Sequence, residues 1–287
     1  HSLLVLPLLA LPIGWLGWRF LNRSGDMKAW IWLAFWSLIT HPLLDSFTTY
    51  GTQLFAPLSD HRFAFDTVAI VDLFYSLPIF AAVALGLRGS VCRDRAAQWS
   101  RRALLWGCLY LAAQLGWTKA NVWRFEARLA DAGFEAVHVR SPAPILWPPL
   151  RHMVARDSNG RIAISKQVLW APERGRIIFV DSLDNERVRA ALSSDRGQIW
   201  RWFSDGMIGV QRLTDGTLVF SDHRYGLYLD PTYSFFRAEL QPGAAPSELS
   251  LVHPRRSRSG INFKQELKAG FELVMGFGDA GEPAHSR

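Results

Sequence analysis

The first third of the chain carries histidine and aspartate residues where long apolar segments begin or end. His1 precedes the first apolar segment, His41 and Asp45 close the second, and Asp72 lies near the start of the third. Ionisable side chains at the level of a membrane are costly and usually serve a function. On a helix, the spacing of four residues places His41 and Asp45 on one face. Imidazole nitrogen and carboxylate oxygen suit zinc or another divalent transition metal, and carboxylate-rich sites also suit Mn or Mg.

The same pattern has a simpler interpretation. A histidine and an aspartate four residues apart recur by chance, and such a pair at a helix end is as consistent with a cap and solvated polar groups. The three apolar segments together form a more specific pattern, because they bring His1, His41 with Asp45, and Asp72 to the same level of the membrane. For the cluster as a whole we therefore favour a metal site.

The loop between the second and third segments adds further polar groups. Asp66 or His61 is the candidate general base, and Arg62 is the candidate contact for an anionic substrate group. An ion pair of Arg62 with Asp60 or Asp66 is an equally good reading of the same residues. Hydroxyl groups at residues 48–53 could bind a phosphate or support a metal ligand, or could turn the chain after a helix.

The elements that would position these groups follow from hydropathy. In a chain of 287 residues with 49% hydrophobic residues, four segments approach the length of about 20 apolar residues that crosses a bilayer. They are residues 2–21, 29–44, 67–87 and 103–118. We expect an α-helical membrane domain of about four transmembrane helices. Two cysteines, Cys92 and Cys108, are too few for a disulfide scaffold or a cysteine-built zinc site.

Basic residues in the connections predict the orientation. The connections after the first and third segments carry eight, and the opposite side carries four. The first set is Arg19, Arg23, Lys28, Arg88, Arg93, Arg95, Arg101 and Arg102, and the second is Arg62, Lys119, Arg124 and Arg128. The excess of basic residues predicts that the first set lies in the cytoplasm. The polar cluster and the C-terminal part of the chain then lie on the outer side. Residues 2–21 lack the features of a signal peptide, and without an initial Met we expect further residues before His1.

The second half reads as a small α+β domain. The expected division is a membrane domain at 1–119, an amphipathic helix and Pro-rich linker at 120–149, an α+β domain at 150–242 and a flexible basic tail at 243–287. Turn residues at 158–160 and at 214–216 predict two β-hairpins, and residues 185–192 predict a helix between them. The basic cluster at 254–258 fits lipid headgroups or solvent better than nucleic acid.

Several motifs resemble a known family. The matching text is HSLL at residues 1–4, THPLLDSFTTYGT at 40–52, PLSDHRF at 57–63, Asp66, and IVD at 70–72, with weaker similarity at 202–204 and 222–226. On these motifs the chain resembles the YbcI/YdjM family of membrane-bound proteins regarded as metal-dependent hydrolases. The resemblance implies a bacterial inner membrane protein with a histidine/aspartate metal site, and it covers most of the chain.

The resemblance also implies roles for single residues. His1, His41, Asp45 and Asp72 match the family's metal ligands, with zinc as the expected ion, and Asp66 matches less closely. The family's upstream PDxD and HRG residues have no counterpart here. If they bind metal, residues 1–287 hold only part of the site.

We therefore expect an integral membrane hydrolase that cleaves an ester or phosphoester at the outer membrane–water interface. Its position suggests membrane lipids as partners and a lipid-linked substrate. The alternative is a non-catalytic membrane scaffold, or partner-binding protein, with a structural metal site. Open coordination positions favour the enzyme, and a closed ligand shell favours the scaffold. A transporter is a third reading, but the inverted repeats that would support it are not evident.

Overall fold

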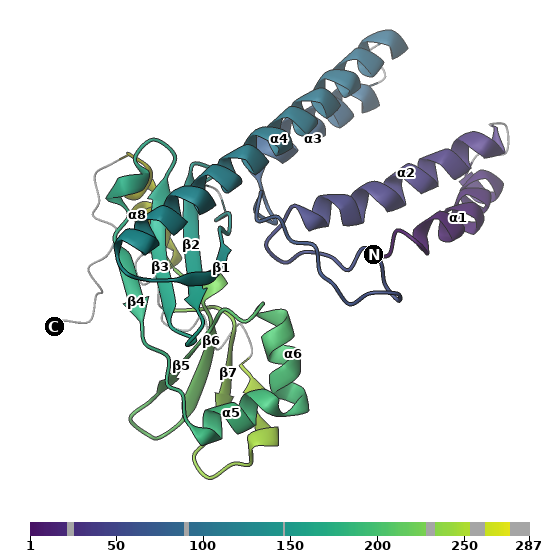
Figure 1. Cartoon of the computed structure of the whole chain (residues 1–287). Coiled ribbons are helices and arrows are strands. Elements are labelled where there is room, and N and C mark those ends of the chain that lie inside the picture. Colours follow the sequence, from purple (N-terminus) through teal and green to yellow (C-terminus); the bar gives the residue numbers. More distant parts are fainter. Residues whose placement is uncertain (22–25, 89–91, 146, 228–232, 253–261, 276–287) are drawn as a thin grey trace. The chain divides into compact units, whose positions relative to one another are not determined.

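The computed structural model describes residues 1–21, 26–88, 92–145, 147–227, 233–252 and 262–275. The chain forms two compact units, residues 1–115 and 116–287. The described part of the first unit is mainly helical, and the second contains two four-stranded antiparallel sheets with short helices (Figure 1). The expected order, helices first and a small α+β domain second, is confirmed.

The first unit contains α1 (Leu6–Leu21), α2 (Met27–Ser46), α3 (Leu73–Leu87) and the first part of α4 (Arg93–Asp131). α1 and α2 form a hairpin that two glycines of α1 hold close together. A Cβ atom at Gly14 would lie 2.5 Å from the Cα atom of Ile31, and one at Gly17 would lie 2.8 Å from the ring of Trp30. Larger residues at either position would push the two helices apart.

The four expected helices are present, but the structure does not confirm that they span a membrane. Among the described residues, no helix combines the length and the apolar character that a bilayer crossing demands. α1 and α3 have 16 and 15 residues, fewer than the roughly 20 that are required. α2 has 20 residues, but its last turns contain His41, Pro42 and Asp45. In α4, charged residues flank the apolar stretch on both sides.

The second unit begins with the last turns of α4, which continue through the region expected to be a separate amphipathic helix. Phe125 and Leu129 of α4 are fully buried against Met153 and Ala163 of the first sheet. That sheet has the strand order β1 (Ala136–Arg140), β2 (Leu150–Asp157), β3 (Ile162–Val168) and β4 (Ile177–Val180). The predicted hairpin at 158–160 is confirmed as the β2–β3 connection, where Gly160 has a φ of 82°.

The second sheet contains β5 (Ile208–Arg212), β6 (Leu218–Asp222), β7 (Arg237–Leu240) and β8 (Ser250–Leu251) in that order. Helices α5 (Glu186–Ser193) and α6 (Asp195–Phe203) pack on it through Val188 and Trp200, beside Phe220. The β5–β6 hairpin and the helix predicted at residues 185–192 are both confirmed, and Asn185 caps α5 by accepting a hydrogen bond from the Val188 N–H.

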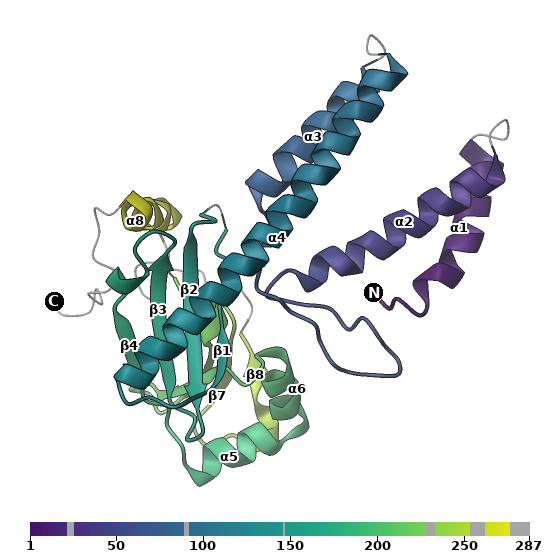
Figure 2. The same ribbon diagram turned by 45° about the horizontal axis from the view of Figure 1, so that its top comes forward.

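The region expected to be a flexible tail contains ordered elements. β8 pairs with β7, and α8 (Phe263–Met275) lies beside the first sheet (Figure 2). Its Val274 is buried beside Leu150 and Val168 of that sheet. Three short 3₁₀ helices, η1 (Pro172–Arg174), η2 (His223–Tyr225) and η3 (Pro246–Glu248), complete the unit. The basic cluster at 254–258 lies outside the described residues.

Candidate metal centre

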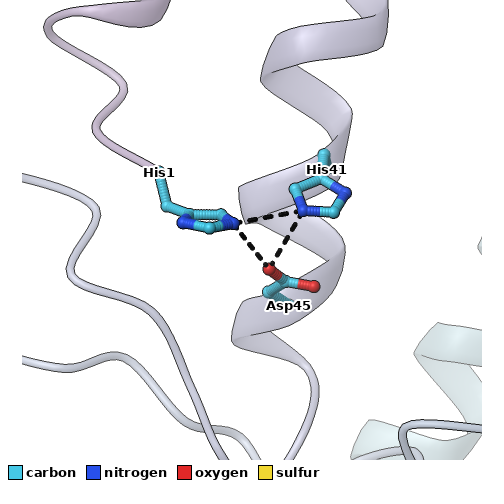
Figure 3. Close-up of side chains that lie close together, drawn as sticks. All are labelled: His1, His41 and Asp45. Carbon is cyan, nitrogen blue, oxygen red and sulfur yellow. Dashed lines mark hydrogen bonds and ion pairs between the residues drawn. The ribbon is translucent and has the colours of Figure 1, made fainter.

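Three of the four predicted ligands converge at the end of α2. The Nε2 atoms of His1 and His41 are 3.2 Å apart, and each lies 3.5 Å from Oδ2 of Asp45 (Figure 3). The two imidazole rings stack with their centroids 5.1 Å apart. Among the described residues, these three form the group of histidine and carboxylate side chains close enough to share one ion.

Local structure explains the convergence. The i, i+4 spacing on α2 places His41 and Asp45 on one face. The N-terminal residues are held beside the loop that follows α2: the Ser2 hydroxyl donates to the Ala56 carbonyl, and the Leu3 N–H donates to the Leu54 carbonyl at 2.9 Å. These contacts fix the start of the chain and bring the His1 ring to α2.

The three donor atoms have the spacing that a zinc ion requires. Ligand atoms at about 2.0–2.1 Å from a tetrahedral zinc ion lie about 3.3–3.4 Å from one another. The observed separations of 3.2, 3.5 and 3.5 Å form such a triangle. The side chains of His1, His41 and Asp45 are 58%, 64% and 38% exposed, so solvent can reach the open face of the triangle.

Asp72 has a different position from the one expected. Its Oδ1 atom caps α3 by accepting from the Tyr75 N–H at 3.1 Å, and its Oδ2 atom accepts from the Tyr110 hydroxyl at 2.8 Å. Gln114 in turn donates to the Tyr110 hydroxyl at 3.0 Å. Asp72 is therefore not in the three-residue group, although it was predicted to join the same ion.

Asp72 and Asp45 nevertheless line one cavity. Its volume is about 270 Å³, and its wall also contains Tyr50, Tyr75 and Val68. The cavity adjoins the metal centre, because Asp45 belongs to both. The sequence did not indicate Tyr110 and Gln114 as supports of Asp72. Their spacing of four residues, as polar side chains inside an apolar segment, is the signal that could have found them.

The loop that carries the predicted catalytic groups folds back on the end of α2. Thr52 and Phe63 exchange backbone hydrogen bonds, and the Phe65 N–H donates to the Ser46 carbonyl at 2.8 Å. Asp66 is buried and adopts a φ of 54°, in the left-handed region that favours Gly, Asn and Asp.

The remaining candidates of that loop are more accessible. His61 is exposed, with its ring edge against Phe63 at 4.6 Å between centroids, while Arg62 is partly buried. Neither His61 nor Asp66 is within sharing distance of the three-residue group. The predicted catalytic groups thus lie on the loop that borders the site.

The second unit has two polar clusters that the sequence did not indicate. Burial tends to raise the pKa of Asp205, but the hydrogen bond from His138 and the charge of Arg140 outweigh it and hold that pKa well below its usual range. Asp222 and Arg224 form an ion pair at 2.6 Å in which both side chains are fully buried. The carboxylate of Asp222 outweighs the desolvation of Arg224 and raises the pKa of its guanidinium.

Comparison with known proteins supports the family resemblance for the first part of the chain. Residues 1–122 match the family model described as YdjM inner membrane protein. The resemblance to the YdjM family is therefore confirmed over these residues, which contain the candidate metal centre and the cavity. The matched range ends before residues 202–204 and 222–226, where we expected weaker similarity. No curated protein and no solved structure matches the chain.

Proposed function

We propose that the chain is a metal-dependent hydrolase of the inner membrane that cleaves an ester or phosphoester. The observation that carries this proposal is the triangle of donor atoms from His1, His41 and Asp45, whose edges fit a tetrahedral zinc ion. The match of residues 1–122 to a family of inner membrane proteins supports the location.

In this proposal each side chain has a defined task. His1, His41 and Asp45 hold the ion. A zinc ion held there would supply Lewis-acid activation of a water molecule. Asp66 or His61 accepts the proton that the attacking water loses, and Arg62 contacts an anionic group of the substrate. Asp72, oriented by Tyr110, shapes the cavity next to the ion instead of binding it.

Open coordination positions at this site would favour an enzyme over a scaffold. Structural zinc sites use four protein ligands in a closed shell, whereas catalytic sites use three and leave a position for water or substrate. The described residues supply three ligand side chains, each more than a third exposed. A non-catalytic metal site would require a fourth protein ligand that covers this face.

Removal and return of the metal test the activity. Purified full-length protein, stripped with a chelator, should hydrolyse no member of a panel of carboxylic ester, phosphomonoester and phosphodiester substrates. Added zinc should restore hydrolysis of at least one class, with a stoichiometry near one ion per chain. Turnover that persists in the stripped protein, or a zinc-loaded protein inactive on every class, would count against the proposal.

We also propose that the helices of the first unit lie in the bilayer in a multi-pass topology, with the second unit on the outer side. Exposed apolar side chains such as Leu8, Phe20, Trp32 and Phe80 would contact lipid. The excess of basic residues in the loops supports a cytoplasmic location for the α3–α4 connection. In a Cys108→Ser variant, a membrane-impermeant maleimide should label Cys92 only after cell lysis, because Cys92 is exposed in that connection. Labelling of intact cells would reverse the orientation.

A further inference from the structure

The cavity beside the metal centre has a wall suited to one class of ligand. We propose that it binds an organic cation of the alkylammonium class, as the end of the substrate that does not react. This inference names the substrate class of the proposed site and so rests on the proposed function. It comes from the charges and rings that line the cavity of about 270 Å³.

The charge of the wall is negative. Two carboxylates line the cavity: Asp72, and Asp45, which His1 and His41 contact from outside the lining at 3.5 Å; among the described lining residues none is Lys, Arg or His. Asp72 is only 7% exposed, and its two oxygens accept hydrogen bonds from the neutral Tyr75 N–H and Tyr110 hydroxyl. Among the described residues no ion pair of Asp72 accompanies these hydrogen bonds. A buried carboxylate without a counter-charge is costly, so a bound cation would supply the missing positive charge.

Aromatic and apolar groups complete the wall. Tyr50 and Tyr75 line the same cavity as Val68 and Ile70. The Tyr75 ring packs closely against Gly107 of α4, where an added Cβ atom would lie 3.2 Å from the ring. Aromatic rings next to carboxylates are the groups with which proteins bind quaternary ammonium ions.

Other ligand classes fit this wall less well. A free phosphate would meet two carboxylates and no cationic side chain of the described lining, so repulsion would oppose its binding. A second divalent metal ion prefers several oxygen ligands around it, whereas much of this wall is apolar. An alkylammonium group carries a diffuse positive charge that suits the carboxylates of the wall. Its apolar methyl or methylene groups suit the aromatic and aliphatic side chains.

Calorimetric titration of the metal-free and the zinc-loaded full-length protein with tetramethylammonium chloride tests this inference. We expect saturable binding to both forms, and no binding of glycerol or inorganic phosphate to the metal-free form. Asp72→Asn should weaken binding about tenfold or more, because it removes the charge but keeps an oxygen that can cap α3. Tyr75→Leu should weaken it roughly three- to tenfold, and Tyr75→Phe should leave it unchanged because the ring remains.

The outcomes separate this inference from the proposed hydrolysis. His41→Ala should end hydrolysis and keep tetramethylammonium binding, since His41 does not line the cavity. Competition by phosphatidylcholine bilayers, and not by phosphatidylglycerol bilayers, would identify a lipid headgroup as the source of the cation. Equal binding in both bilayers would identify a free cation. Absence of saturable binding, equal affinity in a folded Asp72→Asn variant, or a preference for glycerol would overturn the inference, whatever the activity of the enzyme.

Discussion

Replacement of His41 with alanine is expected to reduce zinc-dependent hydrolysis more than about 100-fold, and Asp45→Ala should do the same. Each change deletes one of three donor atoms that lie 3.2–3.5 Å apart. Loss of a ligand weakens metal binding and leaves the remaining groups to repulsion or protonation. Turnover of the substrate identified in the panel, measured together with zinc content, checks this prediction.

Two neighbouring variants separate metal binding from the other tasks of the site. His61→Ala should retain a full complement of zinc, because His61 is not within sharing distance of the ion. Arg62→Ala should also retain zinc, and it should raise KM more than it lowers kcat. All four variants should remain in the membrane fraction, since none removes a large apolar side chain. If His41→Ala and Asp45→Ala keep full metal content and full activity, the assignment of these ligands is wrong.

The largest effect on stability is expected at the buried ion pair of the second unit. Arg224→Met should lower the free energy of unfolding of that unit by about 3–5 kcal/mol, because it leaves Asp222 buried and unpaired. The lost guanidinium also donates to the Phe203 carbonyl at the end of α6. Chemical denaturation of the full chain, followed by tryptophan fluorescence, measures the change.

A matched control comes from the same sheet. Arg212 ends β5 with an exposed side chain, so Arg212→Met should change the free energy of unfolding by less than about 0.5 kcal/mol. An Arg224→Met variant as stable as Arg212→Met would show that the buried pair contributes little net stability. The effect belongs to the second unit, and the zinc content of the first should stay the same.

The sequence was informative where a local rule fixes the structure. Asn-Gly at 159–160 and Asp-Gly at 215–216 predicted both hairpins, and the glycine of each pair adopts the positive φ of a tight turn. The i, i+4 rule placed His41 and Asp45 together on α2. The helix predicted at residues 185–192 is α5, and the structure shows that Asn185 caps its first turn.

Features that depend on distant contacts were not predictable in this way. Asp72 was assigned to the ion from its membrane level and from the family resemblance, but its carboxylate is engaged by the α3 backbone and by Tyr110, 38 residues further along the chain. α4 continues to Asp131 without a break, because the apolar face of its last turns packs on the first sheet. The buried Asp222–Arg224 pair reads as an ordinary surface sequence, since a charged residue gives no local sign of burial.

The ligands of the ion are the most direct test of the account. X-ray absorption at the zinc edge of the reconstituted full-length protein should show only nitrogen and oxygen ligands at about 2.0–2.1 Å, with two imidazoles for each zinc. In the His41→Ala protein, any zinc that remains should have one imidazole. Sulfur ligands from Cys92 or Cys108, an unchanged imidazole count in His41→Ala, or a wild-type protein that binds no zinc would contradict the metal centre described above.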